Sequence, residues 1–94
     1  MARGVQYSGN EALSVAGTAV GFTAATIANK NHAFITVEGA TVRFFVNGQT
    51  ATASLGAELL PGDILELDSA DQLSSFSAIS KDGGTATLRC QFGI

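Results

Sequence analysis

Residues 33–46, AFITVEGATVRFFV, contain two apolar-rich runs separated by a short break at residues 38–41. In the first run Ile35 and Val37 alternate with outward-pointing residues, and the second run continues the alternation from Val42. A period of two with β-branched and aromatic residues is typical of strands buried on one face. A short glycine-containing break between two such runs indicates a β-hairpin. We therefore predict that this hairpin is the centre of a β-sandwich.

Strand patterns continue at residues 13–15, 20–22, 64–67, 73–80 and 85–92. Residues 26–28 are a candidate continuation of the second of these strands, and residues 50–55 a short strand or an extended loop. The last strand is the clearest, because every second residue from Ala86 to Phe92 is apolar. Pro61-Gly62 has the pattern of a type II turn, and residues 81–84 that of a hairpin turn. Gly17 and Gly21 disfavour a helix in the Ala- and Thr-rich segment that precedes the central stretch.

Seven or eight short strands with turns about every 8–12 residues predict an all-β fold. Because 94 residues are too few for two cores, we expect one small β-sandwich, jelly-roll-like or β-barrel domain over residues 11–94. Residues 1–10 are an N-terminal arm or a weak edge strand. Near residues 73–75 a bulge or a one-turn helix is expected, since Phe76 and Ile79 are three apart. The predicted core consists of Ile35, Val37, Val42, Phe44, Leu65, Leu67, Leu88 and Phe92.

The composition favours association with other proteins. Charged residues make up 14% of the chain, against about 25% in a typical soluble domain, so much of the surface is neutral or apolar. The net charge is −3 and the five basic residues are scattered, which argues against binding to nucleic acid or anionic lipid. A single cysteine excludes an internal disulfide and suits a reducing cytosol. No apolar run has the length of a membrane span or of a signal peptide.

The sequence contains no catalytic, cofactor-binding or metal-ligating constellation that we can identify. His32 and Cys90 are each the only residue of their type, whereas a metal site needs three or four ligands. The acidic residues lie at strand ends and turns, and serines 74, 75 and 77 have no basic partner nearby in the sequence. No phosphate-binding loop or nucleophile elbow is present. We therefore expect a protein that is not an enzyme.

Outward-pointing arginines and phenylalanines mark a candidate protein interface. Arg43 and Arg89 lie on the outward faces of two predicted strands, and Phe34 and Phe45 point outward on the predicted hairpin. Arginine and aromatic residues are enriched at interfaces, although a lone arginine equally serves to keep an outer face soluble. Tyr7, in the N-terminal arm, completes the candidate set.

The segment AFITVEGATVRFFVNGQTATASLGAELLPGDILEL (residues 33–67) and the final TATLRCQFGI (residues 85–94) carry a resemblance to a protein class. Their layout resembles small β-rich structural proteins of tailed-bacteriophage virions. The shared pattern is a "VEGAxVR" hairpin, a Thr/Ala-Ser-x-Gly segment, a "GDxLxL" strand and a closing Gly-Thr-Ala-Thr-Leu strand. These elements fall on residues 37–43, 52–56, 62–67 and 84–92, so the resemblance covers residues 33–94.

The resemblance implies a non-enzymatic virion component that is made in the bacterial cytoplasm. A capsid decoration, or cement, protein that binds the outside of the major capsid lattice is the first expectation, and a neck, tail or fibre-attachment component is the alternative. Such proteins are often oligomeric, which favours a homo-oligomer, a trimer before a dimer, with residues 2–10 gripping the capsid or a neighbouring subunit. A receptor- or carbohydrate-binding β-module is the competing class. The absence of tryptophan and the single tyrosine argue against a sugar-binding platform.

Overall fold

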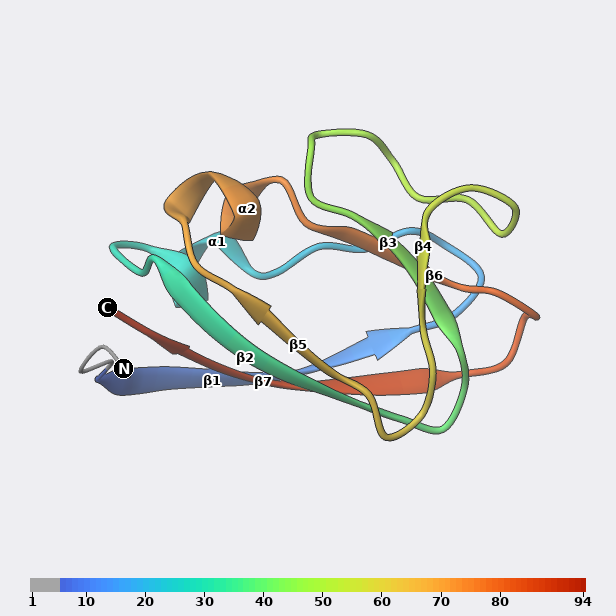
Figure 1. The fold of residues 1–94 in the computed structure, drawn as a ribbon, viewed down its shortest axis with the longest axis horizontal. Coiled ribbons are helices and arrows are strands. Elements are labelled where there is room, and N and C mark those ends of the chain that lie inside the picture. The colour runs from blue at the N-terminus through green and yellow to red at the C-terminus, as the bar shows by residue number, and fades with distance from the viewer. Residues whose placement is uncertain (1–5) are drawn as a thin grey trace.

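The structure, a computed structural model, describes residues 6–94, which form seven strands and two short helices (Figure 1). The strands are β1 (Tyr7–Val15), β2 (His32–Glu38), β3 (Val42–Phe45), β4 (Ala57–Leu59), β5 (Ile64–Leu67), β6 (Ser77–Ser80) and β7 (Ala86–Gly93), and the helices are α1 (Ala24–Ile27) and α2 (Ala70–Ser74). All strand pairs are antiparallel, in a four-stranded sheet of order β1-β7-β2-β5 and a three-stranded sheet of order β4-β3-β6. The predicted all-β sandwich is confirmed.

The core lies between the two sheets and follows the alternation of the strands. In β7 Ala86, Leu88, Cys90 and Phe92 are buried, whereas Arg89 and Gln91 are exposed, as the sequence predicts. Six of the eight predicted core residues are buried, and the other two, Phe44 and Leu65, are partly buried and pack against the core.

The predicted central hairpin is wrong. Strand β2 pairs with β5 and β7, whereas β3 pairs with β4 and β6, so the two strands belong to different sheets. Residues 39–41 therefore cross from one sheet to the other. Gly39 makes the crossing possible with a φ of 96°, a conformation that side chains with a Cβ rarely adopt. The inward and outward positions predicted for each strand are correct. The same alternation is found in two strands whether a hairpin or a crossover joins them, so it does not show which of the two forms.

The turn at residues 81–84 is a second crossover and not a hairpin, because β6 lies in the three-stranded sheet and β7 in the four-stranded one. The two crossovers touch, since a Cβ built on Gly39 would lie 2.8 Å from the carbonyl oxygen of Thr85. By contrast, the turn at Pro61-Gly62 forms as predicted. The N–H of Asp63 donates to the carbonyl of Leu60 at 2.9 Å, and Gly62 has a φ of 94°.

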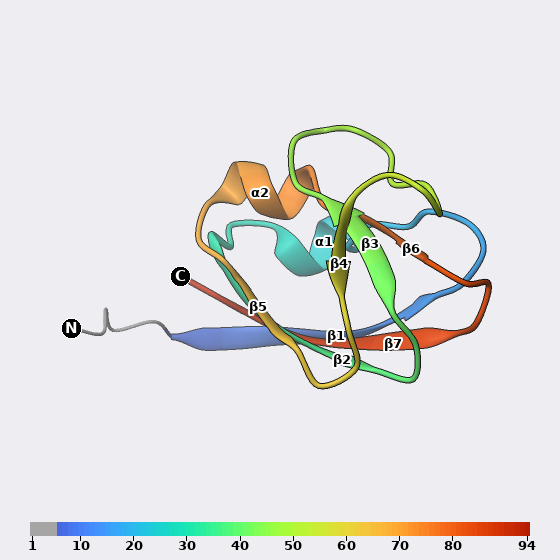
Figure 2. The ribbon, with the colours of Figure 1, turned by 45° about the vertical axis from the view of Figure 1, so that its right-hand side comes forward.

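The two helices close one end of the sandwich above the four-stranded sheet (Figures 1 and 2). Helix α2 begins after Ser69, whose hydroxyl accepts a hydrogen bond from the N–H of Gln72, and it buries Leu73 in the core. The predicted strand at residues 20–22 is only a single bridge from Val20 to Ala78, and the continuation predicted at 26–28 falls largely in α1. Pairing with β6 ends at this bridge, and the chain then turns into α1 at the end of the sandwich.

Strand β1 begins earlier than the sequence indicated. Residues 7–10, assigned to an N-terminal arm, pair with the end of β7, with a bulge between Tyr7 and Gly9. This part of the strand has no apolar alternation that would predict it. Backbone hydrogen bonds to β7 hold it in the sheet without a row of core side chains. The first five residues of the predicted arm lie outside the described residues.

Candidate functional site

Within residues 6–94 no segment covers the outer face of the four-stranded sheet. Figures 1 and 2 show this sheet along the lower side of the domain, with the helices and the three-stranded sheet on its other side. We call this surface the open face. Its outward side chains are Asn10, Ala12 and Ser14 of β1, Thr87, Arg89 and Gln91 of β7, Phe34, Thr36 and Glu38 of β2, and Ile64 and Glu66 of β5.

The strand registers order these side chains in rows across the sheet. One row runs Ala12, Arg89, Thr36, Ile64 from β1 to β5. The next row runs Asn10, Gln91, Phe34, Glu66. Small or polar side chains therefore lie on the β1 side of both rows, and Phe34 and Ile64 lie on the β2–β5 side.

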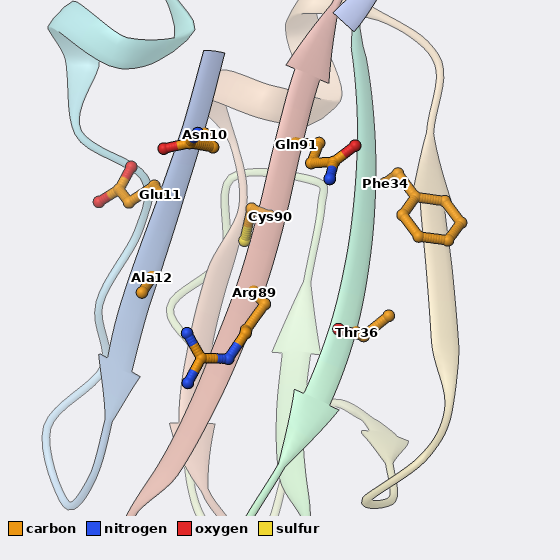
Figure 3. Close-up of a pocket in the computed structure, with 8 residues that line it drawn as sticks. All are labelled: Asn10, Glu11, Ala12, Phe34, Thr36, Arg89, Cys90 and Gln91. Atoms are coloured by element: carbon orange, nitrogen blue, oxygen red, sulfur yellow. The ribbon is translucent and has the colours of Figure 1, made fainter.

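A shallow hollow of about 230 Å³ lies on the open face (Figure 3). It is lined by Asn10, Glu11, Ala12, Phe34, Thr36, Arg89, Cys90 and Gln91. Figure 3 shows the Phe34 ring on the β5 side of the hollow and the Arg89 side chain on its β1 side. The hollow is smaller than the roughly 300–1,000 Å³ of small-molecule sites, so it is sized for a protruding side chain.

Two polar contacts border the hollow. Arg89 Nε donates to Glu38 Oε2 at 3.0 Å, and both side chains are more than half exposed. At the end of the face, Glu66 Oε1 lies 3.6 Å from His32 Nε2. The His32 ring also meets the Tyr7 ring edge-on at 5.7 Å. Tyr7 and His32 flank Gly93 in the register, and a Cβ built on Gly93 would meet the carbonyl oxygen of Gln6.

The opposite side of the sandwich carries a second feature, the loop of residues 46–56 between β3 and β4, which we call the pinned loop. Arg43 holds it through hydrogen bonds from Nε to the Ala53 carbonyl at 2.8 Å and from Nη1 to the Gly56 carbonyl at 3.0 Å. The N–H of Ala51 donates to the Ser77 hydroxyl at 3.0 Å, and Ala51 is buried. Leu55, near the end of the loop, is nevertheless 61% exposed.

Glu58 completes the support of the pinned loop. Its Oε2 lies 3.0 Å from both Arg43 Nη2 and Lys81 Nζ. The hydrogen bond from Lys81, together with the charges of Lys81 and Arg43, outweighs desolvation and lowers the pKa of Glu58 below 4.5. A carboxyl with a lowered pKa in the folded state stabilises the fold above its unfolded-state pKa, and that contribution is lost as the pH falls through the folded-state pKa.

We predict that Glu58→Gln reduces the acid sensitivity of the protein. Wild type should lose stability between neutral pH and about pH 3, and the variant should lose less over the same interval because the neutral amide does not titrate. Urea denaturation at both pH values measures the difference. Asp82→Asn, a change in the exposed turn between β6 and β7, is the control. An acid dependence identical in wild type and Glu58→Gln would contradict the prediction.

The five candidate interface residues divide between the two sides of the domain. Phe34 and Arg89 lie on the open face, and Tyr7 lies at its end. Arg43 and Phe45 lie on β3 in the other sheet, so the continuous Phe34–Arg43–Phe45 patch that the hairpin implied does not form. Arg43 is largely buried by its contacts with the pinned loop and with Glu58.

Sequence reasoning missed Ile64, which is 60% exposed on the open face. The sequence contained a signal for it. Leu65 and Leu67 were predicted to point inward, so the alternation of the strand places Ile64 on the outward side. The Glu38–Arg89 pair spans 51 positions in the sequence, so no local pattern could reveal it.

Other chemical groups add little to the site. The Cys90 thiol is buried, and desolvation, followed by the charge of Glu11, raises its pKa to about 12, so the thiol stays protonated at neutral pH. Within residues 6–94 no group of three or more His, Cys, Asp or Glu side chains is placed to hold a metal ion. The described part of the chain also contains no helix long and apolar enough to cross a membrane.

Comparison of the chain with protein-family models, with curated proteins and with solved structures finds no significant match.

Proposed function

We propose that this protein is a non-enzymatic structural protein of a tailed-bacteriophage virion that binds the outer surface of the major capsid lattice and stabilises the head. The observation that carries the proposal is the pinned loop, which presents exposed Leu55 on a rigid support. The resemblance of residues 33–94 to small virion proteins supplies the biological setting. The capsid surface is then its place of action, and the bacterial cytoplasm its place of synthesis.

The pinned loop is prepared for protein binding. Thr52 and Leu55 exchange backbone hydrogen bonds at 3.2 and 3.3 Å, and the Thr52 hydroxyl accepts a further bond from the Leu55 N–H. With Arg43 holding the loop from below, binding costs little loss of conformational freedom. An exposed leucine among small and neutral residues is suited to contact the surface of another protein. Functional contacts are often made by loops on a rigid scaffold.

Copy number tests the proposed location. The particles produced by a culture that expresses this protein are purified on a density gradient, and its molar ratio to the major capsid protein is measured by mass spectrometry with labelled standard peptides. A decoration protein should approach a fixed ratio to the capsid subunit. A ratio corresponding to a handful of copies would replace the head location by the neck, tail or fibre attachment. Absence from the particles would overturn the proposal.

A matched pair of variants tests the binding surface. Leu55→Asp should weaken binding to heads that lack the protein by about 10–100-fold, the loss expected for removing one buried leucine from an interface. Leu60→Asp is the control, because Leu60 is also exposed but lies in the turn between β4 and β5. Co-sedimentation with purified heads measures both. Equal binding by Leu55→Asp and wild type would show that another surface contacts the capsid.

A further inference from the structure

The open face has the shape of a surface that fits a second copy of itself. In the row from Ala12 to Ile64 the hollow lies on the β1 side, and Ile64 protrudes on the β5 side with 60% of its surface exposed. The protrusion thus stands at one end of this row, and the hollow extends from Ala12 at the other end across Arg89 to Thr36. The inner face of the same sheet packs against the core.

The charges of the open face point to the same occupant. Arg89 and Glu38 lie side by side and are 60% and 56% exposed. A strongly acidic or strongly basic partner would bring one of the two against a like charge, which is costly when water is excluded. A partner surface that itself carries one cation beside one anion can place an opposite charge against Arg89 and against Glu38.

We propose that a second copy of this chain covers the open face in a twofold dimer, with the symmetry axis parallel to the strands and midway between β7 and β2. Such an axis exchanges the two sides of each row. Ile64 then lies over the partner's Ala12 and enters its hollow, and Phe34 lies opposite the partner's Gln91. In the same row Asn10 faces the partner's Glu66, whose carboxylate can accept a hydrogen bond from the amide.

The same axis satisfies the charges. It places the partner's Glu38 above β7, one row away from Arg89, so that each arginine lies between two carboxylates, its own and the partner's. A twofold axis across the strands through this row would instead stack Arg89 on the partner's Arg89. The register therefore selects the axis along the strands. The twofold axis gives a dimer and not the trimer that the resemblance to decoration proteins favoured.

The size of the open face sets the expected affinity. Four strands about 4.8 Å apart and a longest strand, β1, of nine residues at about 3.3 Å each give a face of roughly 570 Å². A standard interface buries about 800 Å² on each partner. The dimer should accordingly be weak, with a dissociation constant on the order of 10–100 μM.

Sedimentation equilibrium of the full chain tests the dimer between about 10 μM and about 1 mM, a range that brackets this dissociation constant. Wild type should pass from monomer to dimer, and Ile64→Lys should raise the dissociation constant by at least about tenfold. Leu55→Lys is the matched control, since Leu55 is equally exposed but lies in the pinned loop. Circular dichroism verifies that each variant is folded. A wild type that stays monomeric at the highest concentration, or an equal effect of the two lysine variants, would overturn the proposal.

Charge reversal gives a second test that a loss of folding cannot imitate. Arg89→Glu should weaken its own homodimer by bringing acidic groups together, and Glu38→Arg should weaken its own homodimer by bringing basic groups together. An equimolar mixture should form a heterodimer, because the glutamate at position 89 of one variant then lies beside the arginine at position 38 of the other. Native mass spectrometry distinguishes the species. A mixture that dimerises no better than either variant alone would overturn the proposed arrangement.

The dimer and the capsid-binding role can fail separately. The dimer predicts that Ile64→Lys changes the sedimentation of the isolated protein and that Leu55→Lys does not. The capsid-binding role is read from Leu55→Asp on heads. If both hold, the dimer carries its two pinned loops on opposite outer sides.

Discussion

Replacing Phe92 by alanine is expected to lower the free energy of unfolding by about 3–5 kcal/mol, the cost of truncating a fully buried phenylalanine. Phe92 is 0% exposed on β7, between β1 and β2, and its ring meets Phe22 edge-on at 5.0 Å. The substitution removes this contact and leaves a cavity where the helical end meets the sheet. Because small domains are stable by only about 5–15 kcal/mol, this loss is a large fraction of the total, and the variant should unfold at a clearly lower denaturant concentration than wild type. Chemical denaturation followed by circular dichroism measures the loss.

Phe45→Ala is the matched control for this prediction. Phe45 is the same residue type but points outward on β3, only partly buried and outside the core, so its truncation should cost about 1 kcal/mol or less. Equal losses for the two variants would show that the core is not organised around β7. A loss of less than about 2 kcal/mol for Phe92→Ala would mean that the site collapses around the missing ring.

The contrast between these phenylalanines shows what the sequence could predict. Inward and outward positions follow from alternation within one strand, which is a local property. Hence Leu88 and Phe92 were placed in the core correctly, and Phe34, Phe45 and Arg89 were placed on outer faces. The turn at Pro61-Gly62 was also predictable, because proline and glycine fix its backbone angles with little help from the rest of the fold.

Assignment of strands to sheets could not be predicted in the same way. The pattern of β2, break and β3 is the same whether the chain folds back within one sheet or crosses to the other, since both arrangements bury the same alternate residues. The choice depends on which strands lie alongside, and those are β5 and β7 for one strand and β4 and β6 for the other. The wrong hairpin also made the predicted interface wrong, because it placed Phe34 and Phe45 on one surface.

The anchoring of the pinned loop by Arg43 could not be predicted from the sequence for a related reason. Its outward direction was correct, but its hydrogen-bond acceptors are backbone carbonyls 10 and 13 positions away in a loop with no regular structure. Backbone carbonyls carry no residue signature, so an arginine that anchors a loop has the same local pattern as one in a protein interface. The open face was similarly hidden, because its rows are formed by strands that are distant in the sequence.

Gly39→Ala is expected to destabilise the protein by about 2–4 kcal/mol, by combining an unfavourable backbone conformation with a steric clash. Gly39 has a φ of 96°, and an added Cβ would lie 2.8 Å from the Thr85 carbonyl oxygen and 3.5 Å from the Ala86 Cα. Both are backbone atoms at the point where the connection from β6 enters β7, so no side-chain rotation relieves the contact. Thermal and urea denaturation measure the loss.

Gly48→Ala separates the two contributions, because Gly48 has a similar φ of 88° but no atom within 4 Å of the added Cβ. It should cost only the backbone term, about 1–2 kcal/mol. The difference between the two variants therefore measures how closely the β2–β3 and β6–β7 connections pack against each other. If Gly39→Ala costs no more than Gly48→Ala, the crossovers are not in contact in solution. A hairpin joining β2 to β3 would then have to be reconsidered, because Gly39 would have no second crossover beside it.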